Sequence, residues 1–158
     1  MDGDVSMSQA QSTHDLEALR RRRAELRESL GVLEDAIAAP AANRAVVWGE
    51  RVHTALLQVA DDFAEHISVT EGPGGLHEQI LAGDLRLANA VSALAEEHVQ
   101  LAAEIADLVH ASDAPVGEDD VEPVREQSMK VLGTLVRHRQ RGADLIFEAF
   151  ETDIGGGG

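Results

Sequence analysis

Four segments of this chain repeat Leu, Val or Ala at spacings of three and four residues, and no segment alternates apolar and polar residues with a period of two. Spacings of three and four put the apolar side chains on one stripe of an α-helix, and this stripe must pack against another element. The pattern therefore predicts helices at about 14–39, 43–71, 84–111 and 123–151, with a short helical piece at 76–82.

Helix-breaking residues separate the four segments. Pro40 ends the first helix, Gly72-Pro73-Gly74-Gly75 ends the second, and a polar stretch at 112–122 lies before the fourth. Four amphipathic helices with two short connections predict an all-α fold, an antiparallel four-helix bundle. The predicted domain organisation is a disordered N-terminal arm at 1–13, the bundle at 14–151 and a flexible Gly-rich tail at 152–158.

The charge and the absence of cysteine restrict the function. The chain has 29 acidic and 13 basic residues, a net charge of −16, and no Cys. Nucleic acids and anionic membranes would repel it, so we expect neither as a partner, whereas a metal cation is compatible with this charge. Disulfides, thiolate metal sites and Cys nucleophiles are excluded. No apolar stretch approaches the ~20 residues of a membrane span, and the N-terminus lacks the apolar core of a signal peptide, so we expect a cytoplasmic protein.

Three histidines mark a candidate site. His66, His98 and His138 each lie on or beside the apolar stripe of a different predicted helix. Helical bundles build metal sites from imidazoles and carboxylates that project inward from facing helices. A single His on an apolar face is more often a hydrogen-bonded packing residue than a ligand, and this interpretation stays open beside the metal site. For the remaining histidines we expect solvated or capping roles: His14, His53, His77 and His110.

Three arginines, Arg137, Arg139 and Arg141, flank His138. They can be interpreted as part of an anion or partner site. Alternate residues on a helix point in different directions, which favours the second interpretation, that they form ion pairs with the surplus acidic residues on the surface.

The arrangement Phe63-Ala64-Glu65-His66-Ile67-Ser68-Val69-Thr70-Glu71, followed by Glu96-Glu97-His98, Arg137-His138-Arg139-Gln140-Arg141 and Leu145-Ile146-Phe147, resembles the hemerythrin-like (HHE cation-binding) family. The resemblance covers roughly residues 14–151. It implies a four-helix bundle that holds a non-haem di-iron centre through His, Glu and Asp. Members of this family bind O2 or respond to oxygen, iron, NO or peroxide.

The ligand pattern of that family is only partly present here. His66, His98 and His138 match its second-, third- and fourth-helix histidines. The family also has a carboxylate four or five residues beyond the second- and fourth-helix histidines, and only Glu71 can take this role. No first-helix histidine aligns, so Glu25 is the best remaining ligand from that helix.

We therefore expect a reduced or mononuclear metal site at His66, Glu71, His98 and His138, with iron as the metal and a small diatomic molecule such as O2 as the ligand. His53 becomes the nearer second-helix ligand if the piece at 76–82 crosses the end of the bundle. The alternative is a metal-free helical scaffold or interaction module, for example a homodimer. A di-iron enzyme is the least supported function because bridging carboxylates are missing.

Overall fold

The computed structural model describes the backbone of residues 2–151 and the side chains of residues 17–150. Its helices are α1 (Asp2–Ala38), α2 (Ala45–Glu71), α3 (Leu76–Gly83), α4 (Ala88–Asp113) and α5 (Val121–Ile146). Short 3₁₀ turns at Leu85–Leu87 and Glu118–Asp120 precede α4 and α5, and a π-helical turn at Phe147–Glu151 follows α5. No strand occurs within residues 2–151.

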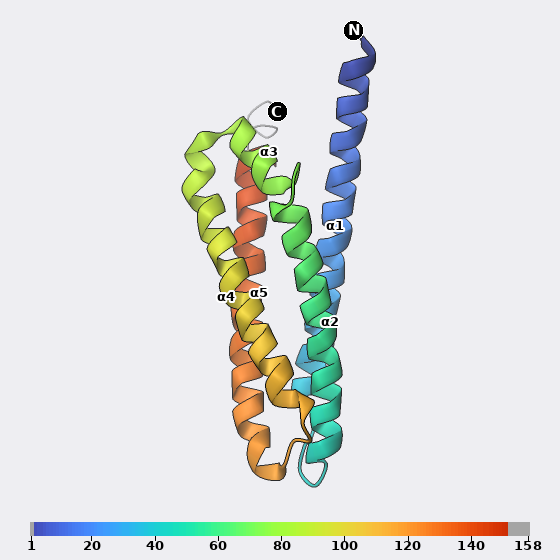
Figure 1. Cartoon of the computed structure of the whole chain (residues 1–158), viewed down its shortest axis with the longest axis vertical. Coiled ribbons are helices and arrows are strands. Elements are labelled where there is room, and N and C mark those ends of the chain that lie inside the picture. The colour runs from blue at the N-terminus through green and yellow to red at the C-terminus, as the bar shows by residue number, and fades with distance from the viewer. Residues whose placement is uncertain (1, 152–158) are drawn as a thin grey trace.

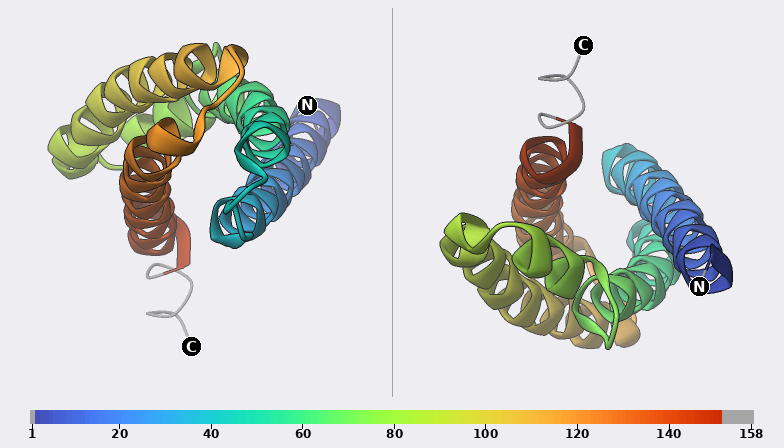
Figure 2. Two further views of the ribbon diagram at one scale, coloured as in Figure 1. Left: turned by 90° about the horizontal axis from the view of Figure 1, so that it is seen from below. Right: turned by 90° about the horizontal axis from the view of Figure 1, so that it is seen from above.

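The four long helices pack antiparallel in sequence order, as predicted (Figure 1). Seen along the bundle axis, they follow one another as α1, α2, α4 and α5, and α1 and α5 lie further apart than the consecutive pairs (Figure 2). The short helix α3 crosses the end of the bundle between α2 and α4 (Figure 1). None of the described helices combines the length and apolar character that a bilayer span requires.

The helix boundaries agree with the periodicity except at the N-terminus. Helix α1 begins at Asp2 instead of near His14, so the backbone of residues 2–13 is helical. The predicted tail at 152–158 lies outside the described residues. The division of the chain into arm, bundle and tail otherwise stays a prediction.

A tight turn carries the chain from α2 into α3. Gly74 has a φ of 71°, in the left-handed region that favours glycine. A Cβ on Gly75 would lie 2.7–2.9 Å from backbone oxygens of 69, 70 and 72, so only glycine fits there. The Glu78 carboxylate accepts a hydrogen bond from the Gly74 N–H at 2.8 Å, which joins the turn to the first residues of α3.

Arg125 of α5 stabilises the opposite end of the bundle. Its guanidinium donates to the carbonyl oxygens of Ile37 (3.2 Å) and Ala39 (3.3 Å), which are at the C-terminal end of α1. It also lies over the indole of Trp48 in α2, 5.4 Å from the ring centroid. These contacts join three helices and satisfy carbonyls that the end of a helix leaves unpaired.

The apolar core has two parts. The larger part contains Leu26, Phe63, Leu101 and Leu135 with the residues beyond them toward the Trp48 end. The smaller part lies toward α3. Its members are Leu19, Leu76, Ile80, Leu87, Val91, Leu94 and Leu145. His98 of α4 and His138 of α5 fall in the sequence between residues of the two parts, and His66 follows the last α2 residue of the larger part.

Candidate metal site

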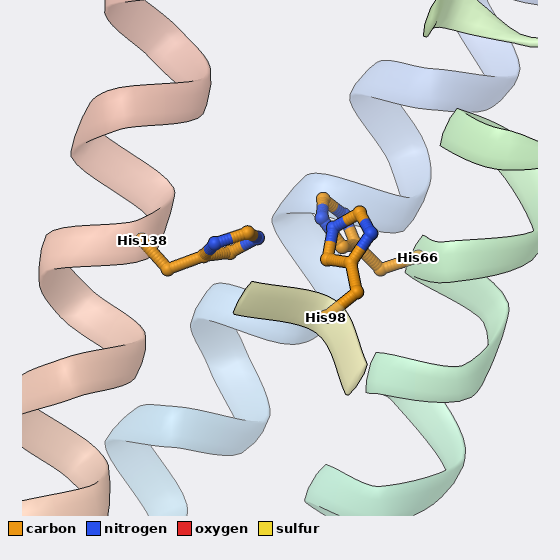
Figure 3. Close-up of side chains that lie close together, drawn as sticks. All are labelled: His66, His98 and His138. Atoms are coloured by element: carbon orange, nitrogen blue, oxygen red, sulfur yellow. The ribbon is translucent and has the colours of Figure 1, made fainter. Parts of the chain in front are cut away.

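His66, His98 and His138 meet between the two parts of the core, and we call them the histidine layer. Their side chains come from α2, α4 and α5 and are turned toward one another (Figure 3). One nitrogen of each ring lies within 4.8 Å of the corresponding nitrogens of the other two. His98 and His138 are 2% exposed and His66 is 9% exposed. The structure thus brings together the three histidines that the sequence singles out.

The apolar periodicity explains how three helices deliver these side chains to one level. Each histidine occupies a core-facing position of its helix, one turn from a buried Phe or Leu on the same stripe. Phe63 lies one turn before His66 and contacts the whole layer, with ring centroids 5.8, 5.8 and 6.0 Å from His66, His98 and His138. One side of the layer is therefore closed by an aromatic ring.

Two carboxylates hold the rings of His98 and His138. Oε2 of Glu71 lies 2.6 Å from Nδ1 of His98, and Oε2 of Glu97 lies 2.8 Å from Nδ1 of His138. An ionised carboxylate can only accept, so Nδ1–H donates in both pairs and Nε2 keeps its lone pair. Carboxylate–histidine pairs of this kind fix the tautomer and orientation of metal-binding imidazoles.

Glu97 is itself held by a cation. Its Oε1 is paired with the guanidinium of Arg141, one turn beyond His138 on α5. Burial raises the pKa of Glu97, but the hydrogen bonds from Arg141 and His138 outweigh it, and the pKa is lowered overall. Glu97 is therefore ionised at neutral pH and remains an acceptor for the imidazole.

His66 has a different environment. Its Nδ1 is buried, and no group among residues 17–150 forms a hydrogen bond with it. Burial, followed by the charges of His98 and His138, lowers the pKa of His66 to about 3. Burial likewise lowers the pKa values of His98 and His138, although their carboxylates act in the opposite direction. All three imidazoles are neutral at pH 7, the state in which a histidine binds a metal.

A small cavity of about 30 Å³ lies beside the layer. Its wall includes Arg23 of α1, His77 of α3 and Arg139 of α5, together with the three histidines. Leucines supply most of the remaining wall. The volume suffices for a water molecule or a small ligand next to the imidazoles.

His77 is a member of this site that the sequence analysis missed. We predicted a solvated or capping role, but its side chain is 7% exposed and its ring is parallel to that of His98, with centroids 5.8 Å apart. Helix α3 folds over the layer and buries this ring. The only sequence signal was its place beside Leu76 at the start of the short helical piece.

The other candidate ligands lie elsewhere. Glu25 pairs with Arg22 at 3.0 Å. His53 contacts Ser112 (3.0 Å) and Asp113 (3.5 Å) at the far end of α4, so His66 is the α2 histidine of the layer. His110 is exposed, and the side chain of His14 lies outside the described residues.

The histidine layer is a buried group that could hold a metal ion, in an all-α protein of four long helices. Comparisons with protein-family models, with curated proteins and with solved structures find no match.

Proposed function

We propose that this protein binds one transition-metal ion through His66, His98 and His138, and that it binds or senses a small ligand there without turning it over. The observation that carries the proposal is the convergence of three neutral, buried imidazoles within 4.8 Å of one another. Zinc, copper, iron and nickel all accept imidazole ligands. Four tetrahedral ligands with bonds near 2.1 Å lie roughly 3.4 Å apart, so small ring rotations would close the layer around an ion.

The hydrogen bonds of Glu71 and Glu97 favour one ion over two. A di-iron centre in a helical bundle uses carboxylates that bridge or complete the metals. Here the two nearest carboxylates are hydrogen-bonded to Nδ1 of His98 and His138, and Glu25 is paired with Arg22. We assign Glu71 to orienting His98 instead of the ligand role that the sequence suggested.

Three protein ligands leave a coordination position open, which is typical of metal sites that bind a further molecule. The adjoining cavity of about 30 Å³ is large enough for a small one. The resemblance to hemerythrin-like proteins favours iron as the metal and O2 or a related diatomic molecule as the ligand. When bound, the metal would supply a Lewis-acidic or redox-active centre.

Anaerobic titration of the metal-free protein with Fe(II), Co(II) or Zn(II), followed by calorimetry and thermal unfolding, tests the proposal. We expect one ion per chain and a rise in Tm, because an ion that binds only the folded state stabilises it. His98→Ala should abolish both, while His110→Ala, an exposed histidine in the same helix, should not. Far-UV circular dichroism shows whether each variant keeps its helices.

The outcomes separate the alternatives. Two ions per chain would contradict the mononuclear site and support a di-iron centre. Absence of binding, with an unchanged Tm for every metal, would contradict the proposal and leave the metal-free scaffold as the better interpretation. Preference for Zn(II) with no spectral response of the Fe(II) form to O2 would contradict the iron and oxygen assignment alone.

A further inference from the structure

Two arginines in the cavity wall lack the ion pairs that other arginines of this acidic chain form. Arg22, Arg125 and Arg141 each have a carboxylate within hydrogen-bond distance. Among residues 17–150, no carboxylate lies within 4.0 Å of Arg23 or Arg139, and neither side chain makes a hydrogen bond. The Nε of Arg139 is fully buried as well.

Arg23 and Arg139 come from α1 and α5, which lie further apart than the consecutive helices of the bundle, and both line the cavity beside the histidine layer (Figure 2). Burial lowers the pKa values of both guanidinium groups, and the like charges of Arg23 and Arg27 further lower that of Arg139. Both guanidinium groups line the same small cavity, where their like charges repel, and the buried Nε–H of Arg139 lacks the acceptor that a buried donor requires.

No residue of the cavity wall carries a negative charge. The four histidines are neutral at pH 7, and the remaining wall is made of Leu, Ile, Thr and Gly. Glu71 and Glu97 are hydrogen-bonded to the Nδ1 side of His98 and His138 and do not belong to the wall. The cavity is thus a small, mostly apolar space that has two positive charges and no counter-ion among the described residues.

We propose that Arg23 and Arg139 form a binding site for a small oxyanion of three or four non-hydrogen atoms, such as formate, nitrite, nitrate or bicarbonate, beside the histidine layer. The planar guanidinium fork matches the geometry of such oxyanions and binds them through paired charge-assisted hydrogen bonds. The small cavity, of about 30 Å³, favours anions of this size over larger ones. The site does not require the metal of the proposed function, although a bound cation would strengthen anion binding.

The test uses the full chain in its metal-free form. Thermal unfolding is measured while sodium nitrite, nitrate or formate replaces sodium chloride at constant ionic strength. We expect Tm to rise by several degrees and to saturate with concentration, as it does for a ligand of the folded state. Arg139→Gln and Arg23→Gln should each weaken anion binding at least tenfold.

Arg137→Gln is the matched control, because Arg137 lies on the same helix, is exposed and donates to Thr134 instead of facing the cavity. This variant should respond to the anions as the wild type does. A second readout needs no added oxyanion: in chloride alone, Arg139→Gln should unfold at the same temperature as the wild type or a higher one, since it removes an unpaired, repelled charge.

Equal stabilisation by chloride and by the oxyanions would overturn the proposal, and so would an undiminished response in both cavity variants. A lower Tm of Arg139→Gln in chloride would also contradict it, because the guanidinium would then have a stabilising contact within the protein. Failure of metal binding leaves this inference standing if the metal-free protein binds the anion, and metal binding without any anion response overturns this inference alone.

Discussion

Oε2 of Glu71, the last residue of α2, lies 2.6 Å from Nδ1 of His98 in the middle of α4. The hydrogen bond joins residues that are 27 positions apart. The bond holds the imidazole so that its other nitrogen, Nε2, faces His66 and His138. The contact therefore orients a candidate metal ligand.

Replacement of this carboxylate should weaken metal binding without removing a ligand. We expect Glu71→Gln and Glu97→Gln each to lower metal affinity by about 10–100-fold, because the amide no longer fixes the tautomer and basicity of the imidazole. Isothermal titration with Co(II) or Zn(II) measures the change. Glu96→Gln, an exposed neighbour on α4, should bind as the wild type does. Complete loss of binding in Glu71→Gln, with the fold intact, would instead indicate that Glu71 is itself a ligand.

The stability of the metal-free protein should fall as the pH is lowered from 7 to 5. Burial lowers the pKa of His66 from 6.5 to about 3, and it also lowers those of His77, His98 and His138. Below pH 6.5 the unfolded chain binds protons that the folded chain does not, so the free energy of unfolding decreases by up to about 1.4 kcal/mol per pH unit for each such histidine.

Urea unfolding at a series of pH values measures this dependence. His66→Leu should show a shallower slope, whereas His110→Ala should keep the slope of the wild type because its side chain is exposed. A free energy of unfolding that stays constant between pH 7 and pH 5 would show that the buried imidazoles do not remain neutral.

Two glycines in helices should respond oppositely to substitution by alanine. A Cβ on Gly49 would lie 2.5 Å from Cγ2 of Val116, in the connection that packs against α2, so Gly49→Ala should destabilise the protein by about 1–3 kcal/mol. A Cβ on Gly31 meets no atom within 4 Å, so Gly31→Ala should stabilise α1 by up to about 1 kcal/mol. Thermal unfolding of the two variants compares the effects directly, and a gain in stability for Gly49→Ala would mean that Val116 does not pack there.

Ser128 should be more stable as alanine. Its side chain is 0% exposed and its Oγ forms no hydrogen bond with the described residues, so the hydroxyl loses solvation without compensation. Ser128→Ala should raise the free energy of unfolding by about 1 kcal/mol. Ser29 is also buried, but its Oγ donates to the carbonyl of Leu26, so Ser29→Ala should gain less. A loss of stability in Ser128→Ala would contradict the assignment of an unpaired hydroxyl.

The helices and the histidine layer could be predicted because both depend on local spacing. Apolar residues spaced three and four positions apart define the stripe of each helix. His66, His98 and His138 occupy positions of those stripes. The environment of each residue depends on packing between helices, which spacing does not describe. His77 is buried only because the Gly72–Gly75 turn folds α3 across the layer.

The environments of the three arginines on α5 likewise depend on packing that the spacing of residues does not describe. Alternation on α5 predicts that Arg137, Arg139 and Arg141 point in different directions, and they do: Arg141 pairs with Glu97, Arg137 donates to Thr134, and Arg139 lines the cavity. Which of the three faces inward depends on the rotation of α5 about its axis. Likewise, the i+5 spacing brings Glu71 near the site, but only the packing of α2 against α4 determines that its carboxylate meets Nδ1 of His98.

The histidine layer also affects how the helices align along the bundle axis when the chain folds. In a leucine-rich bundle one helix can slide along its neighbours by one turn, about 5.4 Å, because each core position is then filled by another apolar side chain. In this protein such a slip would separate His98 from Glu71, or His138 from Glu97, and would leave an imidazole unpaired among leucines. Burial of an unpaired polar group costs about 1–3 kcal/mol. The polar layer therefore disfavours the shifted bundles that a purely apolar core would permit.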